Sequence, residues 1–365
     1  MKKIFTKYLQ KALQKPAERI LRKFNPKIIA ITGSVGKTSA KEAIFFLLSQ
    51  KINKKIWKNQ GNLNTKFGIP LAILGFKNAP VSVDDPSYKN IIWLFYLIFI
   101  WIKYFLIIIK NSYPDFLIIE ISADKPGDIK QICSWLKPHI GVYTKIAPAH
   151  LEFFNDTKGV YEEKKQLAES LTQEGYLILN KLDPWSKNIA KNSKANTCYY
   201  NNNDFDMVEK AAVKVGEIFG IDAEEATRII KKLKPVKGRL NIIQKKSIII
   251  IDDTYNSNPA SASYALQFLK NQKGKRKIAF LGDMLELGRY EEKGHQIIAY
   301  QANQICDFLI LVGSRFKKQK EKANFWFKNS QTAADNIPIQ FQPGDVVLIK
   351  GSRGIKMENI IKKIT

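Results

Sequence analysis

The fold is decided by a stretch near the beginning of the chain, which reads Ile28-Ile29-Ala30-Ile31-Thr32-Gly33-Ser34-Val35-Gly36-Lys37-Thr38-Ser39. Its apolar first part predicts a short buried strand, and the pattern over residues 37–50 predicts a helix. A Gly-rich turn joins the two. Backbone N–H groups of such a turn point at phosphate oxygens, and the helix N-terminus adds a favourable dipole. We therefore expect a nucleotide-binding loop in which Lys37 bridges the β- and γ-phosphates and Thr38 ligates Mg²⁺.

Apolar runs and helical patterns keep alternating along the rest of the chain. This alternation predicts an α/β fold, with a mostly parallel sheet in a central P-loop domain and a Rossmann-like C-terminal domain after it. We expect a basic amphipathic helix at 1–27, the central domain at 28–238 with a hydrophobic insertion at about 86–112, and the C-terminal domain at 239–365. The expected strands are 28–32, 116–121, 140–144, 176–180, 247–253, 277–282, 308–312 and 346–350, with helices near 260–269 and 291–304.

The composition is strongly basic. The chain has 59 lysines and arginines and 33 acidic residues, which gives a net charge of +26. A charge of this sign attracts polyanions. The lysines are spread along the whole chain, and an A+T-biased genome explains them at least as well as nucleic-acid binding does. No zinc-finger or RNP-type motif occurs, so we expect no nucleic-acid partner. Cys133, Cys198 and Cys306 lie far apart without CxxC spacing, as reduced thiols of a cytosolic protein do.

Two segments raise the question of a membrane. Residues 2–25 mix basic and apolar side chains like a basic amphipathic helix, without the apolar core or cleavage site of a signal peptide. In residues 91–109, 18 of 19 are apolar or aromatic, and hydropathy alone predicts a transmembrane helix. A single crossing, however, would place two strands of one sheet on opposite sides of the bilayer. We expect a re-entrant or interfacial hairpin, a helix buried against protein or a partner, or a helix in the membrane plane on an anionic surface.

Further motifs follow the phosphate loop in order along the chain. They are Gly61-Asn62-Leu63-Asn64-Thr65 with Gly68-Ile69-Pro70-Leu71, Ile119-Glu120-Ile121-Ser122-Ala123-Asp124 with Pro126-Gly127-Asp128-Ile129, Ala147-Pro148-Ala149-His150-Leu151-Glu152, Asp252-Asp253-Thr254-Tyr255-Asn256-Ser257-Asn258-Pro259, Gly282-Asp283-Met284-Leu285-Glu286-Leu287-Gly288 and Lys350-Gly351-Ser352-Arg353. With the shortened phosphate loop, this series resembles the Mur ligase family, and within it the branch that adds D-alanyl-D-alanine. The resemblance implies an ATP-dependent acid–amino-acid ligase of peptidoglycan precursor synthesis, in the cytoplasm or peripheral on the inner face of the cell membrane.

In the central domain, the resemblance implies a site for ATP and two Mg²⁺ ions. The residues that it implies for ATP are Gly33, Ser34, Gly36, Lys37, Thr38 and Ser39, and those for the metal are Thr38, Glu120, His150 and Lys164. Lys164 stands where the family carries a carbamylated lysine, which serves as an oxygen ligand; the neighbouring Lys165 is the alternative. Without the family resemblance, three of these residues have simpler explanations. Glu120 would be a solvent-exposed residue at the end of a strand, His150 would be a structural histidine, and Lys164 would be a solvent-exposed lysine on a helix.

In the second domain, the resemblance implies a nucleotide-facing set and an acceptor-binding set. Arg239 would reach the γ-phosphate, and Asp253 would meet the ribose and phosphates. Tyr255, Asn256 and Asn258 would line the nucleotide cleft, while Lys350, Ser352 and Arg353, with Asn62 and Asn64 of the central domain, would bind substrate. The catalytic residues would then be Lys37, Lys164, His150 and Arg239. Asp283 and Glu286 are either capping and turn residues or substrate contacts.

The implied chemistry passes through an acyl phosphate, with domain closure as part of the mechanism. ATP phosphorylates the terminal carboxylate of a UDP-muramoyl-peptide-like donor, and the amine of D-alanyl-D-alanine attacks the product. The chain departs from the family in three ways. Only 27 residues precede the first strand, too few for the domain that grips the UDP group; residues 180–206 leave no room for the usual strand-rich insert; and the HNxxN adenine element is absent. This leaves a membrane- or lipid-linked donor, another amino-acid acceptor, or a non-catalytic nucleotide-binding membrane scaffold as alternatives.

Overall fold

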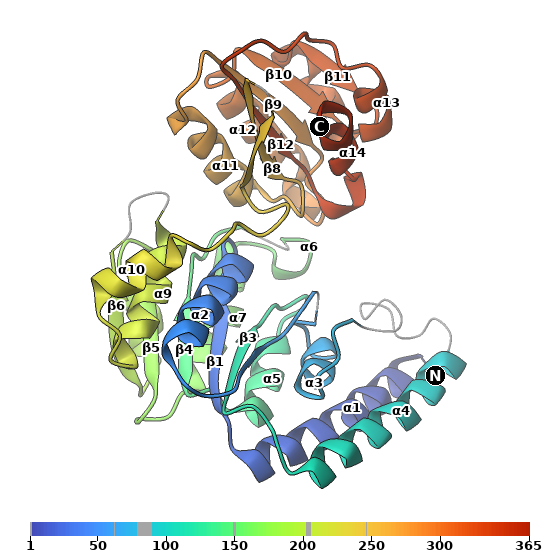
Figure 1. Cartoon of the computed structure of the whole chain (residues 1–365). Coiled ribbons are helices and arrows are strands. Elements are labelled where there is room, and N and C mark those ends of the chain that lie inside the picture. The colour runs from blue at the N-terminus through green and yellow to red at the C-terminus, as the bar shows by residue number, and fades with distance from the viewer. Residues whose placement is uncertain (1, 62, 79–89, 149–150, 202–205, 246) are drawn as a thin grey trace. The chain divides into compact units, whose positions relative to one another are not determined.

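The computed structural model describes the chain except residues 1, 62, 79–89, 149–150, 202–205 and 246 (Figure 1). The chain divides into two compact units. Unit 1 comprises Met1–Ile146 and Tyr161–Leu233, and unit 2 comprises Ala147–Val160 and Lys234–Thr365. The division between Leu233 and Lys234 falls shortly before the linker expected at Lys237-Gly238-Arg239.

Unit 1 is built on a parallel sheet in the order β2-β3-β1-β4-β5-β6. Its strands are β1 Lys27–Thr32, β2 Ile56–Lys58, β3 Phe116–Glu120, β4 Ile140–Tyr143, β5 Tyr176–Asn180 and β6 Asn196–Tyr200. In the register of the central strands, Ile31 pairs with Glu120 and Thr32 pairs with Tyr143. The carboxyl ends of β1, β3 and β4 therefore lie at one edge, where open α/β sheets bind their ligands. The four strands expected in this part of the chain are confirmed.

Helices cover both faces of this sheet. They are α2 Lys37–Lys51, α3 Gly68–Ile73, α5 Asp128–Leu136, α7 Thr157–Glu169, α8 Ser186–Lys191, α9 Met207–Ile218 and α10 Ala223–Ile230. One core forms where Ile31 and Ile118 of the sheet pack against Ile44 of α2 and Ala211 of α9. On the opposite face, Tyr143 at the end of β4 donates its hydroxyl hydrogen bond, at 2.6 Å, to the carbonyl of Lys164 in α7. The packing thus fixes α2 and α7 next to the ligand-binding edge.

Two long helices lie side by side on unit 1: α1 (Lys2–Phe24) and α4 (Asn90–Lys110) (Figure 1). The guanidinium of Arg19 lies 5.6 Å from the ring centre of Trp101, and Lys23 donates a 3.1 Å hydrogen bond to the carbonyl of Ile108. The two helices therefore run in the same direction. Because residues 90–110 form one continuous helix, the expectation of a hairpin is wrong. Among the described residues, no helix has the length and apolar character needed to cross a membrane.

Unit 2 contains a mixed sheet in the order β11-β10-β9-β12-β8-β7, in which only the β7–β8 pairing is antiparallel. Its strands are β7 Asn241–Lys245, β8 Ile248–Asp253, β9 Arg276–Gly282, β10 Phe308–Val312, β11 Phe325–Phe327 and β12 Asp345–Lys350. Its helices are α6 Leu151–Phe154, α11 Pro259–Asn271, α12 Glu291–Asn303, α13 Ser330–Asp335 and α14 Glu358–Ile364, with the short 3₁₀ turns η1 Gly288–Tyr290, η2 Arg315–Lys322 and η3 Arg353–Ile355. Buried apolar residues fill both faces of the sheet, and the expected strands and helices of this part are confirmed.

Candidate active site

The phosphate loop is a tight turn between β1 and α2 whose glycines are required by the backbone. Gly33 has φ 148°, and a Cβ built there would lie 1.9 Å from Oγ1 of Thr144. Gly36 has φ 81° and forms the N-cap of α2. The N–H of Ser34 is bound by the carbonyl of Lys145 at 2.6 Å, which fixes the loop against the end of β4. Only glycine avoids both the clash and the left-handed strain, so these positions are set by the loop geometry.

The first turn of α2 faces the end of this loop. The N-cap residue, Gly36, has no side chain, so it does not occupy the N–H groups of the first turn. Thr38 and Ser39 lie in that turn and are half-buried. Lys37 donates a 2.9 Å hydrogen bond from Nζ to the carbonyl of Gly33, so its side chain folds back over the loop. The arrangement suits an anion held by backbone N–H groups and one ammonium.

Glu120, at the end of β3, is buried beside the loop and makes polar contacts with two side chains. One carboxylate oxygen accepts a 3.1 Å hydrogen bond from Asn64, and the other lies 3.4 Å from the ammonium of Lys41. Lys41 is 2% exposed and lies one helical turn after Lys37. We did not predict this lysine from the sequence, although its spacing of one turn from Lys37 places both on the same face of α2. Glu120 is therefore buried, and the alternative explanation as a solvent-exposed residue at the end of a strand is wrong.

Lys164 is buried in α7, and the positive charge of Lys37 acts on it. Burial, assisted by repulsion from Lys37, lowers the pKa of Lys164 to about 7. Lys165 has a different environment: it is paired with Glu162 at 2.6 Å and with Glu169 at 3.6 Å on the outer side of the helix. The two adjacent lysines are thus distinguished by their surroundings, and Lys164 is the one beside the phosphate loop.

The residue next to Lys164 anchors a neighbouring loop. Glu163 accepts hydrogen bonds of 2.6 Å from the N–H groups of Gly127 and Ile129, which fixes the start of α5. Asp128 in turn accepts a 2.9 Å bond from Lys66. Burial raises the pKa of Glu163, and the hydrogen bonds from the two backbone N–H groups offset only part of this rise. These anchors were missed in the sequence because nothing in their spacing distinguishes them from ordinary helix and turn residues.

His150 and Asn62 lie outside the described residues, so their predicted roles stay predictions. The other two histidines are engaged elsewhere. His139 accepts a 3.1 Å bond from the N–H of Ile28, and buried His295 accepts a 3.0 Å bond from the N–H of Met284. Within the part of the chain that the structure describes, no three His, Cys, Asp or Glu side chains gather in a way that could hold a metal ion. The predicted metal set combines the carboxylate of Glu120 with the hydroxyl of Thr38, a modified Lys164 and His150, and it stays a prediction.

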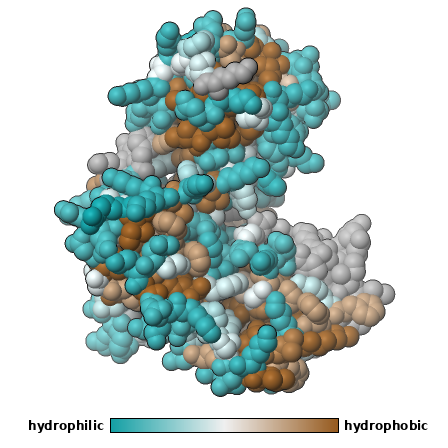
Figure 2. Space-filling model, viewed as in Figure 1, coloured by the Kyte–Doolittle hydropathy of each residue, from teal (hydrophilic) through white to brown (hydrophobic). Residues whose placement is uncertain are grey.

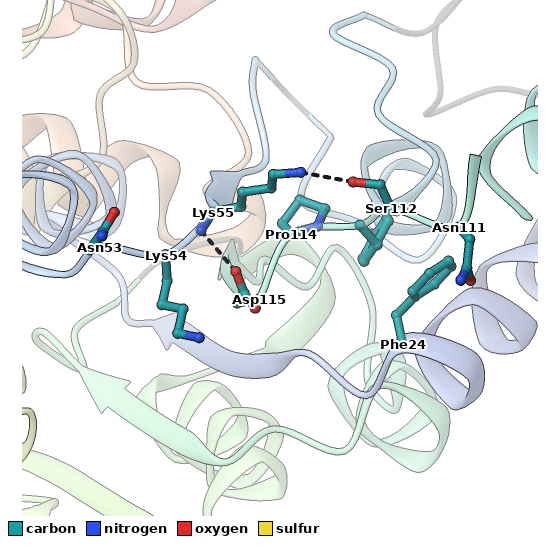
Figure 3. A pocket seen from close by; sticks show the side chains of 9 residues that line it. Phe24, Asn53, Lys54, Lys55, Asn111, Ser112, Pro114 and Asp115 are labelled. Atoms are coloured by element: carbon teal, nitrogen blue, oxygen red, sulfur yellow. Dashed lines mark hydrogen bonds between the residues drawn. The ribbon is translucent and has the colours of Figure 1, made fainter.

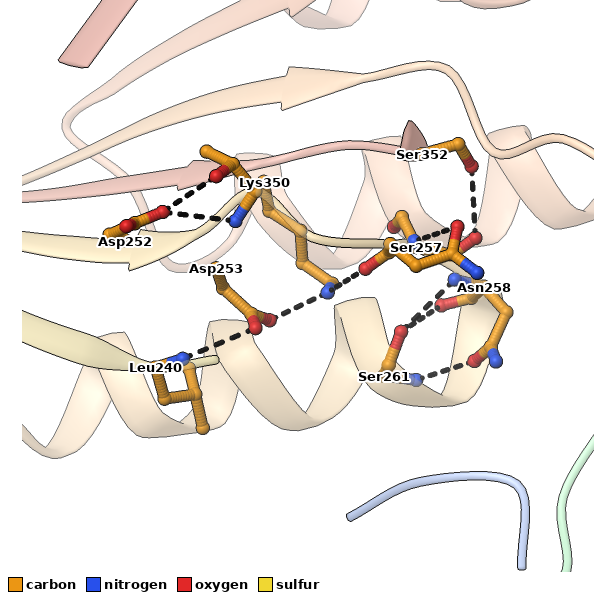
Figure 4. Close-up of polar contacts among 10 residues, drawn as sticks. Leu240, Asp252, Asp253, Ser257, Asn258, Ser261, Lys350 and Ser352 are labelled. Atoms are coloured by element: carbon orange, nitrogen blue, oxygen red, sulfur yellow. Dashed lines mark hydrogen bonds and ion pairs between the residues drawn. The ribbon is translucent and has the colours of Figure 1, made fainter. Parts of the chain in front are cut away.

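In unit 2, a buried ion pair joins the ends of β8 and β12 (Figure 4). Lys350 donates hydrogen bonds to Asp253 at 2.6 Å and to the carbonyl of Asn256 at 2.9 Å. The second oxygen of Asp253 accepts a 3.2 Å bond from the N–H of Leu240. Burial raises the pKa of Asp253 and lowers the pKa of Lys350, and the attraction between the charges opposes both shifts. With 1% of its surface exposed, Lys350 holds this loop in place, and its predicted contact with a substrate carboxylate stays a prediction.

Two arginines stack on Tyr255 at the edge of this cluster. The guanidinium of Arg239 lies 4.0 Å from the ring centre, and that of Arg353 lies 5.9 Å from it. Nε of Arg239 is buried and has no hydrogen-bond partner among the described residues. A buried donor without a partner is costly, and a bound anion would satisfy it. The structure thus brings Arg239, Asp253, Tyr255 and Arg353 together, and their predicted contacts with nucleotide or acceptor stay predictions.

Three other predicted or considered residues serve the local structure, and Figure 4 shows two of them, Asn258 and Ser352. Asn258 caps α11 and forms a capping box with Ser261. Ser352 is buried; its hydroxyl donates to the carbonyl of Ser257 at 3.1 Å and accepts from the N–H of Leu285 at 2.9 Å. Asp283 accepts bonds of 3.1 Å from the N–H groups of Arg315 and Phe316, which supports its reading as a capping residue. Direct contacts of Asn258 and Ser352 with ligand stay predictions.

A shallow hollow lies apart from these residues, at the C-terminal ends of α1 and α4 (Figure 3). Its polar groups bind one another: Nζ of Lys55 donates to Ser112 at 2.8 Å, and the N–H of Lys55 donates to Asp115 at 2.9 Å. It contains none of the residues predicted to bind ligand, so it does not compete with the phosphate loop as the active site.

Two family models match the chain over contiguous parts. The Mur ligase middle domain matches residues 102–242, and the glutamate ligase domain of the Mur ligases matches residues 238–353. The chain belongs to the Mur ligase family. The predicted family resemblance and fold class are thereby confirmed, and the enzyme class that goes with the family is that of ATP-dependent ligases.

Relatives of this Mur ligase align over nearly its whole length. The UDP-N-acetylmuramoyl-tripeptide–D-alanyl-D-alanine ligase of Rickettsia prowazekii is 27% identical and is matched over 96% of this chain and 80% of its own length. The enzyme of the same name from Bacillus subtilis is 24% identical over 97% of this chain and 79% of its own. The crystal structure of the MurF ligase from Thermotoga maritima in complex with ADP shares the fold, with a TM-score of 0.77 and 24% identity over 97% of this chain and 83% of that one.

Proposed function

We propose that the chain is a cytoplasmic ATP-dependent ligase that adds D-alanyl-D-alanine to a UDP-N-acetylmuramoyl-tripeptide. The observation that carries the chemistry is Lys164, which is buried beside the phosphate-loop Lys37 with its pKa lowered to about 7. The names of the relatives from Rickettsia prowazekii and Bacillus subtilis support the two substrates. The ADP complex of the Thermotoga maritima structure supports ATP as the phosphoryl donor.

The reaction has two steps in this proposal. In the first, a carboxylate oxygen of the tripeptide attacks the γ-phosphorus of ATP, the bond from that phosphorus to the bridging oxygen breaks, and ADP leaves. In the second, the amine nitrogen of D-alanyl-D-alanine attacks the acyl carbon and loses a proton, and phosphate leaves with the former carboxylate oxygen. Lys37 and the N–H groups at the start of α2 would stabilise the phosphoryl oxygens. In unit 2, Arg239 offers an unpaired buried donor to a phosphate.

The oxygen donors beside the loop fit Mg²⁺. Thr38 contributes a hydroxyl and Glu120 a carboxylate, and this cation prefers such hard ligands. When bound, Mg²⁺ would supply positive charge against the phosphate oxygens during transfer. We propose two ions, with His150 and a carbamylated Lys164 completing the ligand set.

The environment of Lys164 favours carbamylation. A neutral lysine nitrogen attacks CO₂, forms a nitrogen–carbon bond and releases one proton, whereas an ammonium cannot react. Because burial and Lys37 lower the pKa of Lys164 to about 7, much of the group is neutral near physiological pH. The product is an anion, so repulsion between two ammonium groups is replaced by attraction between the carbamate and Lys37.

A second candidate function is ligation of a membrane- or lipid-linked donor, or of a different amino-acid acceptor. One observation favours the membrane- or lipid-linked donor: α4 exposes a row of large apolar side chains, among them Phe95, Ile102 and Ile109. We propose on this ground that the enzyme is peripheral on the inner face of the cell membrane and contacts its anionic surface.

A panel of donors and acceptors tests the proposal. The protein is incubated with Mg²⁺-ATP, one donor (UDP-N-acetylmuramoyl-tripeptide, its dipeptide precursor or a lipid-linked peptide) and either D-alanyl-D-alanine or a single amino acid. Mass spectrometry identifies the product, and ADP is quantified in parallel. We expect one amide product from the tripeptide and the dipeptide acceptor. ATP binding without ADP in every combination would favour the non-catalytic scaffold and overturn the proposal.

A further inference from the structure

The outward face of α4 carries an uninterrupted row of large apolar side chains (Figure 2). Each of them has half or more of its surface exposed, and they recur at the three- and four-residue spacing of one helix face. They are Phe95, Ile98, Phe99, Ile102, Phe105, Leu106 and Ile109. This row is called the apolar stripe below.

The single basic residue between them does not interrupt the stripe. Lys103 turns to the side of the helix, where its ammonium donates a 2.9 Å hydrogen bond to the carbonyl of Gly75 and lies 4.0 Å from the ring centre of Phe76. The opposite face of α4 is held by the protein, because Ile100 and Tyr104 are buried. The helix is therefore fixed in one rotational setting, with the stripe outward.

The neighbouring helix α1 supplies mainly charge, and Tyr8 is a large side chain that its described residues expose. Most of its other described apolar side chains face the protein, with Leu9, Leu13, Ala17 and Ile20 at most 2% exposed. Its outward face carries basic side chains, all in the exposed class: Lys11, Lys15, Arg19, Arg22 and Lys23. Arg19 lies over Trp101 of α4, and Lys23 binds the Ile108 carbonyl, so this basic face borders the stripe directly.

We propose that α1 and α4 together form a docking surface for an anionic lipid bilayer, in which α4 inserts its stripe between the headgroups and α1 contacts lipid phosphates without inserting. A helix lying in the interface buries its apolar face while basic residues beside it attract anionic lipids. The charge of α1 favours a bilayer over a second copy of the chain. A second copy docked on the stripe would bring two basic α1 faces together, and repulsion between them would oppose association. The inference rests on the peripheral location proposed above and not on ligase chemistry, so its failure leaves the ligase proposal standing.

Vesicle co-sedimentation of the full chain tests this surface. The probes are vesicles of phosphatidylcholine alone and vesicles with an added fraction of phosphatidylglycerol, at low and at high salt. We expect binding to the anionic vesicles, weakened at high salt because surface charge is screened. Equal binding to both compositions, or none to the anionic vesicles at low salt, would overturn the proposal.

Matched variants locate the surface. Ile102 and Ile297 are the same residue type with nearly equal exposure, 50% and 51%, but Ile297 belongs to α12 in unit 2. I102E should weaken vesicle binding about tenfold or more, and I297E should leave it unchanged. The affinity of the milder I102S should fall between those of I102E and the wild type.

A second set of variants tests the basic face of α1. The double variant K11E/K15E should abolish the preference for phosphatidylglycerol, whereas K187E/K191E on α8 should retain that preference.

The remaining outcomes also decide the question. Equal loss in I102E and I297E, or in both lysine pairs, would mean that binding is non-specific attraction to a basic protein and would overturn the assigned surface. A dimer in size-exclusion chromatography that I102E abolishes, without vesicle binding by the wild type, would identify a second copy as the occupant. ATP turnover of I102E without vesicles serves as the folding control, because Ile102 lies outside the catalytic residues.

Discussion

The ammonium of Lys41 lies 3.4 Å from Oε2 of Glu120, and both side chains are almost fully buried beside the phosphate loop. The pair couples α2, which carries Lys37, to the end of β3, which carries the predicted metal ligand. The carboxylate of Glu120 also accepts a 3.1 Å hydrogen bond from Asn64, so both of its oxygens have polar neighbours within the protein.

Removing the cation should destabilise unit 1. K41M removes the cation 3.4 Å from the buried carboxylate of Glu120, and we expect a loss of about 3–5 kcal/mol in the free energy of unfolding, because one partner of a buried ion pair is lost. Denaturant unfolding measures it, with K54M at an exposed position as the control. A loss below about 0.5 kcal/mol, typical of surface substitutions, would show that the pair does not hold the loop.

The pH dependence of stability should reveal the environment of Lys164. The pKa of Lys164 is lowered from 10.5 to about 7 in the folded protein. Between these values the unfolded chain binds one more proton, so the stability of the wild type relative to K164M should rise with pH, by up to about 1.4 kcal/mol per pH unit. Below the folded pKa both states bind the proton and the two curves should run parallel. Unfolding in CO₂-free buffers at several pH values measures this; parallel curves over the whole range would show that the lysine is not titrating at a lowered pKa.

Activity should separate the two adjacent lysines. K164M removes the proposed carbamate and should lower ligation by roughly 10²-fold or more, the range for loss of one electrostatic group at a reacting phosphoryl. K165M, which removes ion pairs with Glu162 and Glu169 and a contact with the ring of Tyr161, should leave it nearly unchanged. Short carboxylic acids added to K164M should restore part of the rate. If K164M is active and K165M is not, the carbamylated lysine is Lys165 and the assignment to Lys164 is wrong.

Arg239 provides a test in unit 2. R239K retains the charge but loses the planar fork that stacks 4.0 Å from Tyr255 and whose Nε has no partner among the described residues. We expect turnover to fall roughly 10²–10³-fold, with a loss of stability within about 1 kcal/mol. R228K on α10 is the matched control. Unchanged turnover in R239K would show that Arg239 does not contact a phosphate during the reaction.

The sequence allowed most of the architecture to be predicted, because the buried strands are short apolar runs between Gly-rich turns and helical patterns. The phosphate loop was placed correctly because Gly33 and Gly36 are required by its backbone. Strands β2, β6, β7 and β11 were missed: they lie at the edges of the two sheets, and their partly exposed side chains leave little apolar signal. Lys41 and Lys350 could not be predicted as buried ion-pair members, because burial of a lysine depends on a carboxylate that the fold brings from another strand. The predicted roles of Ser352 and Asn258 came from motif position alone, which does not show that their side chains are already bound within the protein.

The most direct test of the ligase proposal follows the oxygen that leaves with phosphate. The donor tripeptide is prepared with a heavy oxygen isotope in its terminal carboxylate, and the phosphate released in the presence of ATP and D-alanyl-D-alanine is examined by mass spectrometry. An acyl phosphate requires that each released phosphate carry one labelled oxygen and that release depend on both the donor and the amine. Unlabelled phosphate, or release that continues when the amine or the donor is omitted, would contradict the account.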